Sequence, residues 1–144
     1  MNEVVTTRWI GKMAFESAID EFRIKMDCLE EHGGTHQGPR PKPLVLSALA
    51  GCTGMDILSI LNKKKISPDK FDIHVNGELT ETHPKYYKVI RITFELTGPS
   101  YKSDPSVLDK VNQAVILSRD NYCAVSKMLS GSCEISHEII LHDS

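Results

Sequence analysis

Two of the four cysteines in this chain occupy positions where a thiol could do chemistry. Cys52 lies in its most hydrophobic stretch, LSALAGCTGMD (46–56), and Cys123 follows Asp120 and Asn121 near the start of a short helical pattern. A helix N-terminus stabilises a thiolate, which is the nucleophilic form of cysteine, through backbone N–H groups and the positive end of the dipole. With Asp120 or Asn121 as the N-cap, Cys123 is either an activated sulfur or a first-turn cysteine packed beneath a loop.

Cys52 lies in the middle of its predicted helix, so its own helix dipole does not activate it. Asp56 follows one turn later, and a nearby carboxylate would raise the pKa of the thiol by like-charge repulsion. Taken alone, Cys52 fits a small apolar core residue. A cation or a second thiol from elsewhere in the chain would have to activate it. Cys28 and Cys133, at the ends of predicted strands, are expected to be packing residues.

The rest of the composition excludes several classes of function. The net charge of −2 and the absence of a clustered basic excess argue against a nucleic-acid partner. No CxxC pair or Cys/His grouping has zinc spacing, so we expect no metal site and no cofactor.

Asp56 interrupts the apolar run 44–61, which argues against a membrane span, since an aspartate at mid-bilayer costs about 2.5–3.5 kcal/mol.

The four widely spaced cysteines and the start MNEVVTTRWIG, which has no apolar leader pattern, predict a reducing, cytoplasmic location. The 144 residues fit a single domain, 1–144. Short alternating runs over VVTTRWIG, KMAFES and EFRIKMD predict a small antiparallel meander. A Gly- and Pro-rich loop, EEHGGTHQGPRPKP, follows it.

A change to helical periodicity then predicts a helix from Pro43 to Lys65. Alternation predicts strands at 69–81 and 87–98, forming a hairpin. A second helix begins at Pro105 with Asp104 as its N-cap, and a short helix at 121–131 precedes a final strand at 132–142. This order predicts an α+β fold with antiparallel sheet.

The predicted helix at 43–65 is apolar around most of its circumference. The exception is a stripe of small or partly polar residues: Ala48, Cys52, Met55, Asp56 and Ser59. A helix that needs apolar cover on all sides must lie at the centre of a structure, and a chain of this size has little material to surround it. Oligomerisation would supply the missing cover.

Two segments resemble signatures of the OsmC/Ohr family. GPRPKPLVLSALAGCTGMDILSILNKKK (38–65) resembles the central-helix signature, and RDNYCAVSKMLSGSCEISHEI (119–139) resembles the second cysteine signature. The order of elements matches over nearly the whole chain. The resemblance implies an intertwined α+β homodimer, in which antiparallel sheets surround long, buried central helices.

The resemblance also implies a thiol peroxidase that acts on organic hydroperoxides. Cys52 corresponds to the cysteine that attacks the peroxide and becomes a sulfenic acid, and Cys123 to the resolving cysteine that forms a disulfide with it. A dithiol reductant would reset the pair.

The family's activating Arg/Glu pair does not carry over to this chain. The family glutamate precedes the central helix, where this chain has Lys42 and Pro43. The family arginine follows the first strand, where Lys12 is the only cation, and Arg40 is another candidate near the site. The chain therefore resembles an OsmC-like subgroup. Two alternatives remain: a non-catalytic module that binds an apolar ligand or partner at the dimer groove, and a structural dimer with inert thiols.

Overall fold

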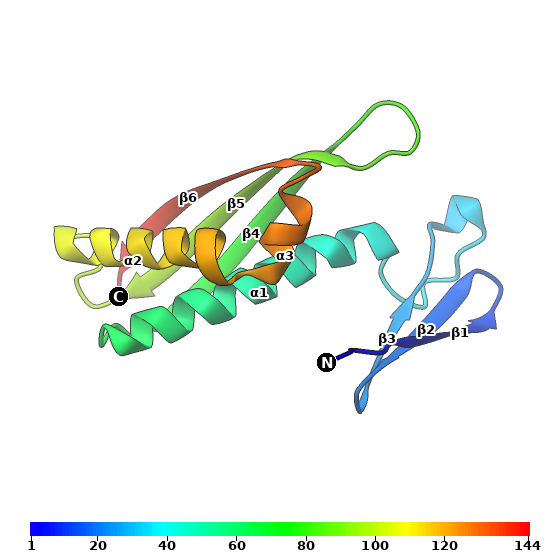
Figure 1. The fold of residues 1–144 in the computed structure, drawn as a ribbon, viewed down its shortest axis with the longest axis horizontal. Helices are drawn as coiled ribbons and strands as arrows, with labels where there is room; N and C mark the ends of the chain where they lie inside the picture. Colours follow the sequence, from blue (N-terminus) through cyan, green and yellow to red (C-terminus); the bar gives the residue numbers. More distant parts are fainter. The chain divides into compact units, whose positions relative to one another are not determined.

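The computed structural model describes residues 1–144, which form two compact units, Met1–Val45 and Leu46–Ser144 (Figure 1). The boundary falls within the first turns of helix α1 (Pro41–Lys63), which begins two residues before the predicted Pro43. The single-domain organisation stays a prediction.

The first unit contains the predicted antiparallel meander. Its strands pair in the order β1 (Thr6–Gly11), β2 (Ala14–Ile19) and β3 (Phe22–Met26). Two tight turns connect them, and each contains a residue with positive φ, Lys12 at 49° and Asp20 at 51°. The predicted three-strand arrangement is therefore confirmed.

The Gly- and Pro-rich loop after β3 is ordered around one buried carboxylate. Asp27 is only 3% exposed and accepts hydrogen bonds from the backbone N–H groups of Cys28 (2.8 Å), Thr35 (3.0 Å) and Gln37 (3.2 Å). At Gly34 the chain passes so close to itself that a Cβ would lie 1.9 Å from the carbonyl oxygen of Cys28. The glycines here serve close backbone contact, which the sequence pattern did not reveal.

The second unit is built on a three-stranded sheet in the order β4 (Lys70–Leu79), β5 (Tyr87–Gly98) and β6 (Glu134–Asp143). β4 and β5 form the predicted antiparallel hairpin. β6 runs parallel to β5, which corrects the expectation of a purely antiparallel sheet. The helices between these strands carry the chain back to the end of the sheet where β5 begins, as a parallel crossover requires.

This crossover contains helix α2 (Pro105–Leu117), a π-helical turn η2 (Ser118–Tyr122) and the short helix α3 (Ala124–Leu129). α2 begins as predicted, because the Asp104 side chain accepts a hydrogen bond from the Ser106 N–H at 2.9 Å and Pro105 occupies the first turn.

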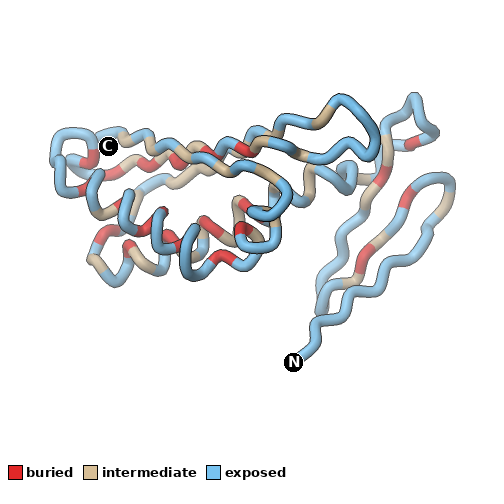
Figure 2. Tube along the Cα trace, turned by 45° about the horizontal axis from the view of Figure 1, so that its top comes forward, coloured by how far each residue is buried: buried red, intermediate tan, exposed pale blue.

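The core of the second unit lies between the helices and one face of the sheet, with buried positions on the helices and in the sheet (Figure 2). Along β5 the buried positions alternate with less buried ones. One stripe of α1 is buried: Leu49, Thr53, Ile57 and Leu61. It packs in one cluster with the inward side chains of β5: Ile90, Ile92, Phe94 and Leu96.

The expectation that the long helix is buried on all sides is not met within one chain. The side of α1 away from the sheet leaves Met55 75% exposed and Leu58 40% exposed. By length and hydropathy alone α1 could cross a membrane. However, its buried stripe packs on the sheet and its Asp56 carboxylate is hydrogen-bonded, as in the core helix of a soluble protein.

We expect the exchange of Asp27 for asparagine to loosen the loop of the first unit. An amide has one acceptor oxygen and directs N–H donors toward the backbone donors that Asp27 now accepts. Amide hydrogen exchange at Thr35 and Gln37 should become faster by about tenfold. The matched control, Asp20→Asn, alters a turn residue whose positive φ asparagine tolerates, and it should leave both rates unchanged.

The same carboxylate gives the loop a dependence on pH. Backbone hydrogen bonding, led by Thr35, lowers the pKa of Asp27 below its ordinary value of 3.8. Its stabilising contribution is therefore complete above about pH 4 and is lost as the pH falls through the lowered pKa. Equal exchange rates in wild type and Asp27→Asn at neutral pH would contradict this role.

Candidate redox site

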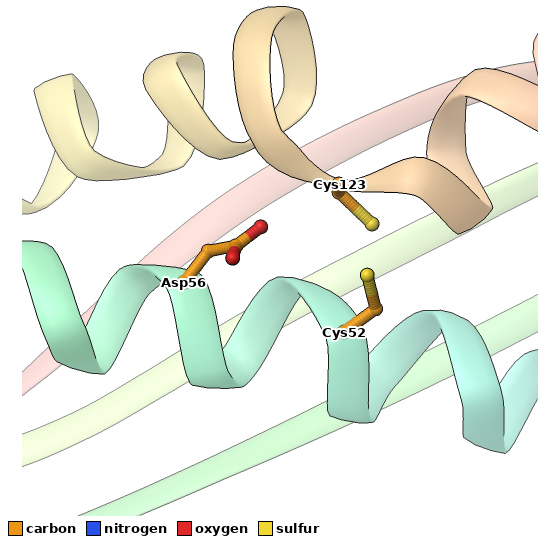
Figure 3. Close-up of side chains that lie close together, drawn as sticks. All are labelled: Cys52, Asp56 and Cys123. Atoms are coloured by element: carbon orange, nitrogen blue, oxygen red, sulfur yellow. The ribbon is translucent and has the colours of Figure 1, made fainter. Parts of the chain in front are cut away.

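The structure brings Cys52, Asp56 and Cys123 together. One ligand atom from each, the two Sγ atoms and a carboxylate oxygen, all lie within 4.8 Å of one another. Cys52 and Asp56 lie one turn apart on α1, and Cys123 comes from the junction of η2 and α3. Figure 3 shows the two sulfurs directed toward each other, with the carboxylate beside them. We call these three residues the thiol cluster.

Cys123 is positioned by the π-helical turn and by α3. Its backbone N–H bonds the carbonyl of Ser118 at 2.8 Å, closing the turn. Cys123 itself is the N-cap of α3, and its Sγ accepts a hydrogen bond from the Ser126 N–H at 3.4 Å. This corrects the prediction that Asp120 or Asn121 would cap the helix, because the π turn delays its start. Cys123 is 3% exposed, so the thiol is both capping and buried.

The surroundings of Cys52 favour the protonated thiol. Burial raises the pKa of Cys52 most, and its hydrogen bond with Cys123 and the charges of Cys123 and Asp56 also raise it. A backbone hydrogen bond with Val125 acts in the opposite direction. None of the main contributions to this pKa comes from a basic side chain. The expected direction of the Asp56 effect, a higher pKa of the Cys52 thiol, is therefore confirmed.

Asp56 is held in place by a buried hydroxyl that sequence reasoning did not assign to the site. Ser118 is 1% exposed, and its Oγ donates to Oδ2 of Asp56 at 3.0 Å. Ser118 continues the buried face of α2 at helical spacing from Val111 and Val115. A polar residue at such a position was the signal that could have identified it.

The predicted cations belong to the first unit. Lys12 lies in the turn between β1 and β2, where its carbonyl accepts a hydrogen bond from the Trp9 indole at 2.8 Å. Arg40 immediately precedes α1. The cluster itself lies in the second unit, and the roles of Lys12 and Arg40 in activation stay predictions.

The other two cysteines lie outside the cluster. The thiol of Cys133 donates to the carbonyl of Leu129 at 3.1 Å, and that of Cys28 donates to the carbonyl of His32 at 3.3 Å. Each therefore closes a local backbone turn, and both serve as internal controls for the reactivity of the cluster.

A pocket of about 450 Å³ opens beside Asp56. It lies between the C-terminal half of α1 and the end of α2 with η2, and its lining is mixed: Asp56, Ser59, Ile60, Lys63, Lys64, Leu117 and Tyr122. A small molecule entering here meets the carboxylate of the thiol cluster at one end and lysines further along α1.

We expect Asp56→Asn to lower the pKa of Cys52, because it removes one of the negative charges that disfavour the thiolate. Alkylation of Cys52 by iodoacetamide, followed site by site with mass spectrometry, should then accelerate at a given pH below the pKa. Alkylation of Cys133 in the same sample should not change. Slower modification of Cys52 in the variant would show that Asp56 assists ionisation instead.

Comparison with known proteins places this geometry in a family. The OsmC-like protein family model matches residues 33–138, which include the whole thiol cluster. The protein YhfA of Escherichia coli K12 is 28% identical over 130 residues, covering 90% of this chain and 91% of that protein.

Solved structures share the fold over nearly their whole length. A hypothetical protein from Aquifex aeolicus VF5 is 28% identical with a TM-score of 0.79, covering 99% of this chain and 98% of that one. The organic hydroperoxide resistance protein OhrB of Bacillus subtilis has the same fold at 19% identity and a TM-score of 0.64, covering 96% of this chain and 98% of that one. The chain belongs to the OsmC-like family.

Proposed function

We propose that this protein is a two-cysteine thiol peroxidase that reduces organic or hydrogen peroxides. The observation that carries the proposal is the proximity of the Cys52 and Cys123 sulfurs, within 4.8 Å, although the residues lie far apart in the chain. Membership of a family that includes a protein named for organic hydroperoxide resistance supports it.

The chemistry proceeds in two steps on these sulfurs. The Cys52 thiolate attacks one peroxide oxygen, the O–O bond breaks, and an alcohol or water leaves with a proton while Cys52 becomes a sulfenic acid. The Cys123 thiolate then attacks the sulfenic sulfur, forming the disulfide and releasing water. A dithiol reductant returns two electrons and two protons and restores both thiols.

Activation of Cys52 is the demanding part of this cycle. Because burial raises the pKa of Cys52 above its ordinary value of 9.0, only a small fraction is thiolate at neutral pH. Oxidation should therefore accelerate as the pH rises toward that pKa, unless a cation such as Lys12 or Arg40 approaches the sulfur. The backbone hydrogen bond with Val125, at the start of α3, already favours the charged form of Cys52.

The working form proposed here is a cytoplasmic homodimer. In a single chain, α1 exposes Met55 and Leu58 on the side away from the sheet. The first unit separately exposes large side chains such as Trp9 and Phe22. Large apolar side chains that gather on an exposed face commonly mark a protein interface. A second copy of the chain would supply the cover that α1 lacks.

Addition of one equivalent of an organic hydroperoxide to the reduced protein should produce an internal Cys52–Cys123 disulfide, seen as a mass loss of two hydrogens. Cys123→Ser should instead retain a sulfenic acid on Cys52, trapped by dimedone, and Cys52→Ser should lose peroxide consumption. The control Cys133→Ser keeps the cluster complete and should react like wild type.

Full retention of free thiols in wild type under excess peroxide, both at neutral pH and at a pH above 9.0 where the thiolate fraction of Cys52 is larger, would exclude the peroxidase. That result, with an apolar probe bound to the folded protein, would favour the non-catalytic binding module. Oxidation at Cys133 in place of Cys52 would also refute the assignment.

Met55→Glu should shift the protein from dimer to monomer in sedimentation, because it places a charge in the exposed apolar face of α1. The matched control is Leu108→Glu on α2, where the exposed side chain lies outside that face. A wild-type monomer, or a dimer that both substitutions leave intact, would contradict this interface.

A further inference from the structure

We propose that the reduced thiol cluster binds a divalent metal ion that prefers sulfur ligands, and that Zn²⁺ is the ion bound in the cell. The sequence predicted no metal site, because no single stretch carries metal-ligand spacing. The fold assembles the ligands from two segments: Cys52 and Asp56 from α1, and Cys123 from the start of α3.

The geometry fits three protein ligands of one tetrahedral ion. Zinc binds thiolate sulfur at about 2.3 Å and carboxylate oxygen at about 2.0–2.2 Å, so neighbouring ligand atoms of a tetrahedron are roughly 3.4–3.8 Å apart. The three atoms here already lie within 4.8 Å of one another. Small side-chain rotations close the remaining gap, and a water molecule would complete the coordination.

The atoms behind the ligands are arranged as a metal site requires. Ser118 donates to Oδ2 of Asp56, which fixes the carboxylate and leaves its other oxygen for the ion. The Ser126 N–H bonds the Cys123 sulfur, and the backbone of Val125 bonds the Cys52 sulfur. Each sulfur therefore has a backbone partner behind it that would hold it in place as a ligand.

Charge also favours a cation here, because two thiolates beside the Asp56 carboxylate would place three negative charges within 4.8 Å of one another. A divalent ion replaces two thiol protons and leaves a net charge of minus one, so each metal bound releases two protons. Because the metal and a Cys52–Cys123 disulfide need the same sulfurs, occupancy and oxidation exclude each other.

The test is a titration of the reduced, full-length protein with Co²⁺, followed by displacement with Zn²⁺. We expect one Co²⁺ per chain, with a thiolate charge-transfer band in the near ultraviolet and the visible bands of tetrahedral Co²⁺, both lost when Zn²⁺ is added. Affinity should rise with pH, because thiol ligands lose their protons when they bind the ion. The disulfide form should not bind.

Variants locate the ion. Cys52→Ser and Cys123→Ser should lose the charge-transfer band at one equivalent, and the isosteric Asp56→Asn should weaken binding by about tenfold or more. Ser118→Ala, which removes only the hydroxyl that positions Asp56, should weaken it by about 10- to 100-fold. The control is the double substitution Cys28→Ser with Cys133→Ser, which should bind like wild type.

Loss of the spectrum in that control, its persistence in either cluster cysteine variant, or no binding by wild type would each overturn the site. The titration uses no peroxide, so its result is independent of the proposed peroxidase. Conversely, a metal-free protein that still forms the disulfide would leave the peroxidase standing.

Discussion

The thiol cluster depends on the rotational setting of α1 against its sheet. Four residues at four-residue intervals, from Leu49 to Leu61, form the stripe that packs on the inward side chains of β5. The one polar residue of this stripe, Thr53, has a hydrogen-bond partner in the core, because its hydroxyl donates to the Leu49 carbonyl at 2.9 Å. With about 100° between successive residues, this setting turns Cys52 and Asp56 toward the crossover that carries Cys123. A different rotation would separate the sulfurs.

That placement has an electrostatic consequence. The packing that brings two thiols and a carboxylate together buries Cys123 and partly buries Cys52 and Asp56, and burial is the main reason that the Cys52 pKa is raised. The backbone donors at the start of α3 offset this only in part. The thiols of the cluster would therefore become negatively charged only when a positive group offsets that charge. Their reactivity depends on whether the positive group is a proton, a basic side chain or a metal ion.

Features with strong local periodicity could be predicted from the sequence. The strands at 70–79 and 87–98, the helix capped by Asp104 and the two informative cysteines are examples, because alternation, capping chemistry and residue type are local signals. The parallel direction of β6 was missed because it depends on how the intervening helices return the chain. The N-cap at Cys123 was missed because a π turn has no clear sequence pattern, and Ser118 reached the site only through tertiary packing.

The two distinctive features of α1, its exposed apolar face and its thiol, are geometrically linked. On the helix, Met55 lies about 60° around from Cys52, roughly opposite the buried stripe, and Leu58 lies about 60° further around in the same direction. Cys52 therefore occupies the border between the face that packs on the sheet and the face left exposed. A second copy that covered Met55 would also remove water from the Cys52 sulfur, which makes the thiolate still harder to form without a counter-charge. In the proposed dimer, assembly and activation would thus be coupled: the dimer would have to deliver a cation to Cys52 or leave the thiol inert.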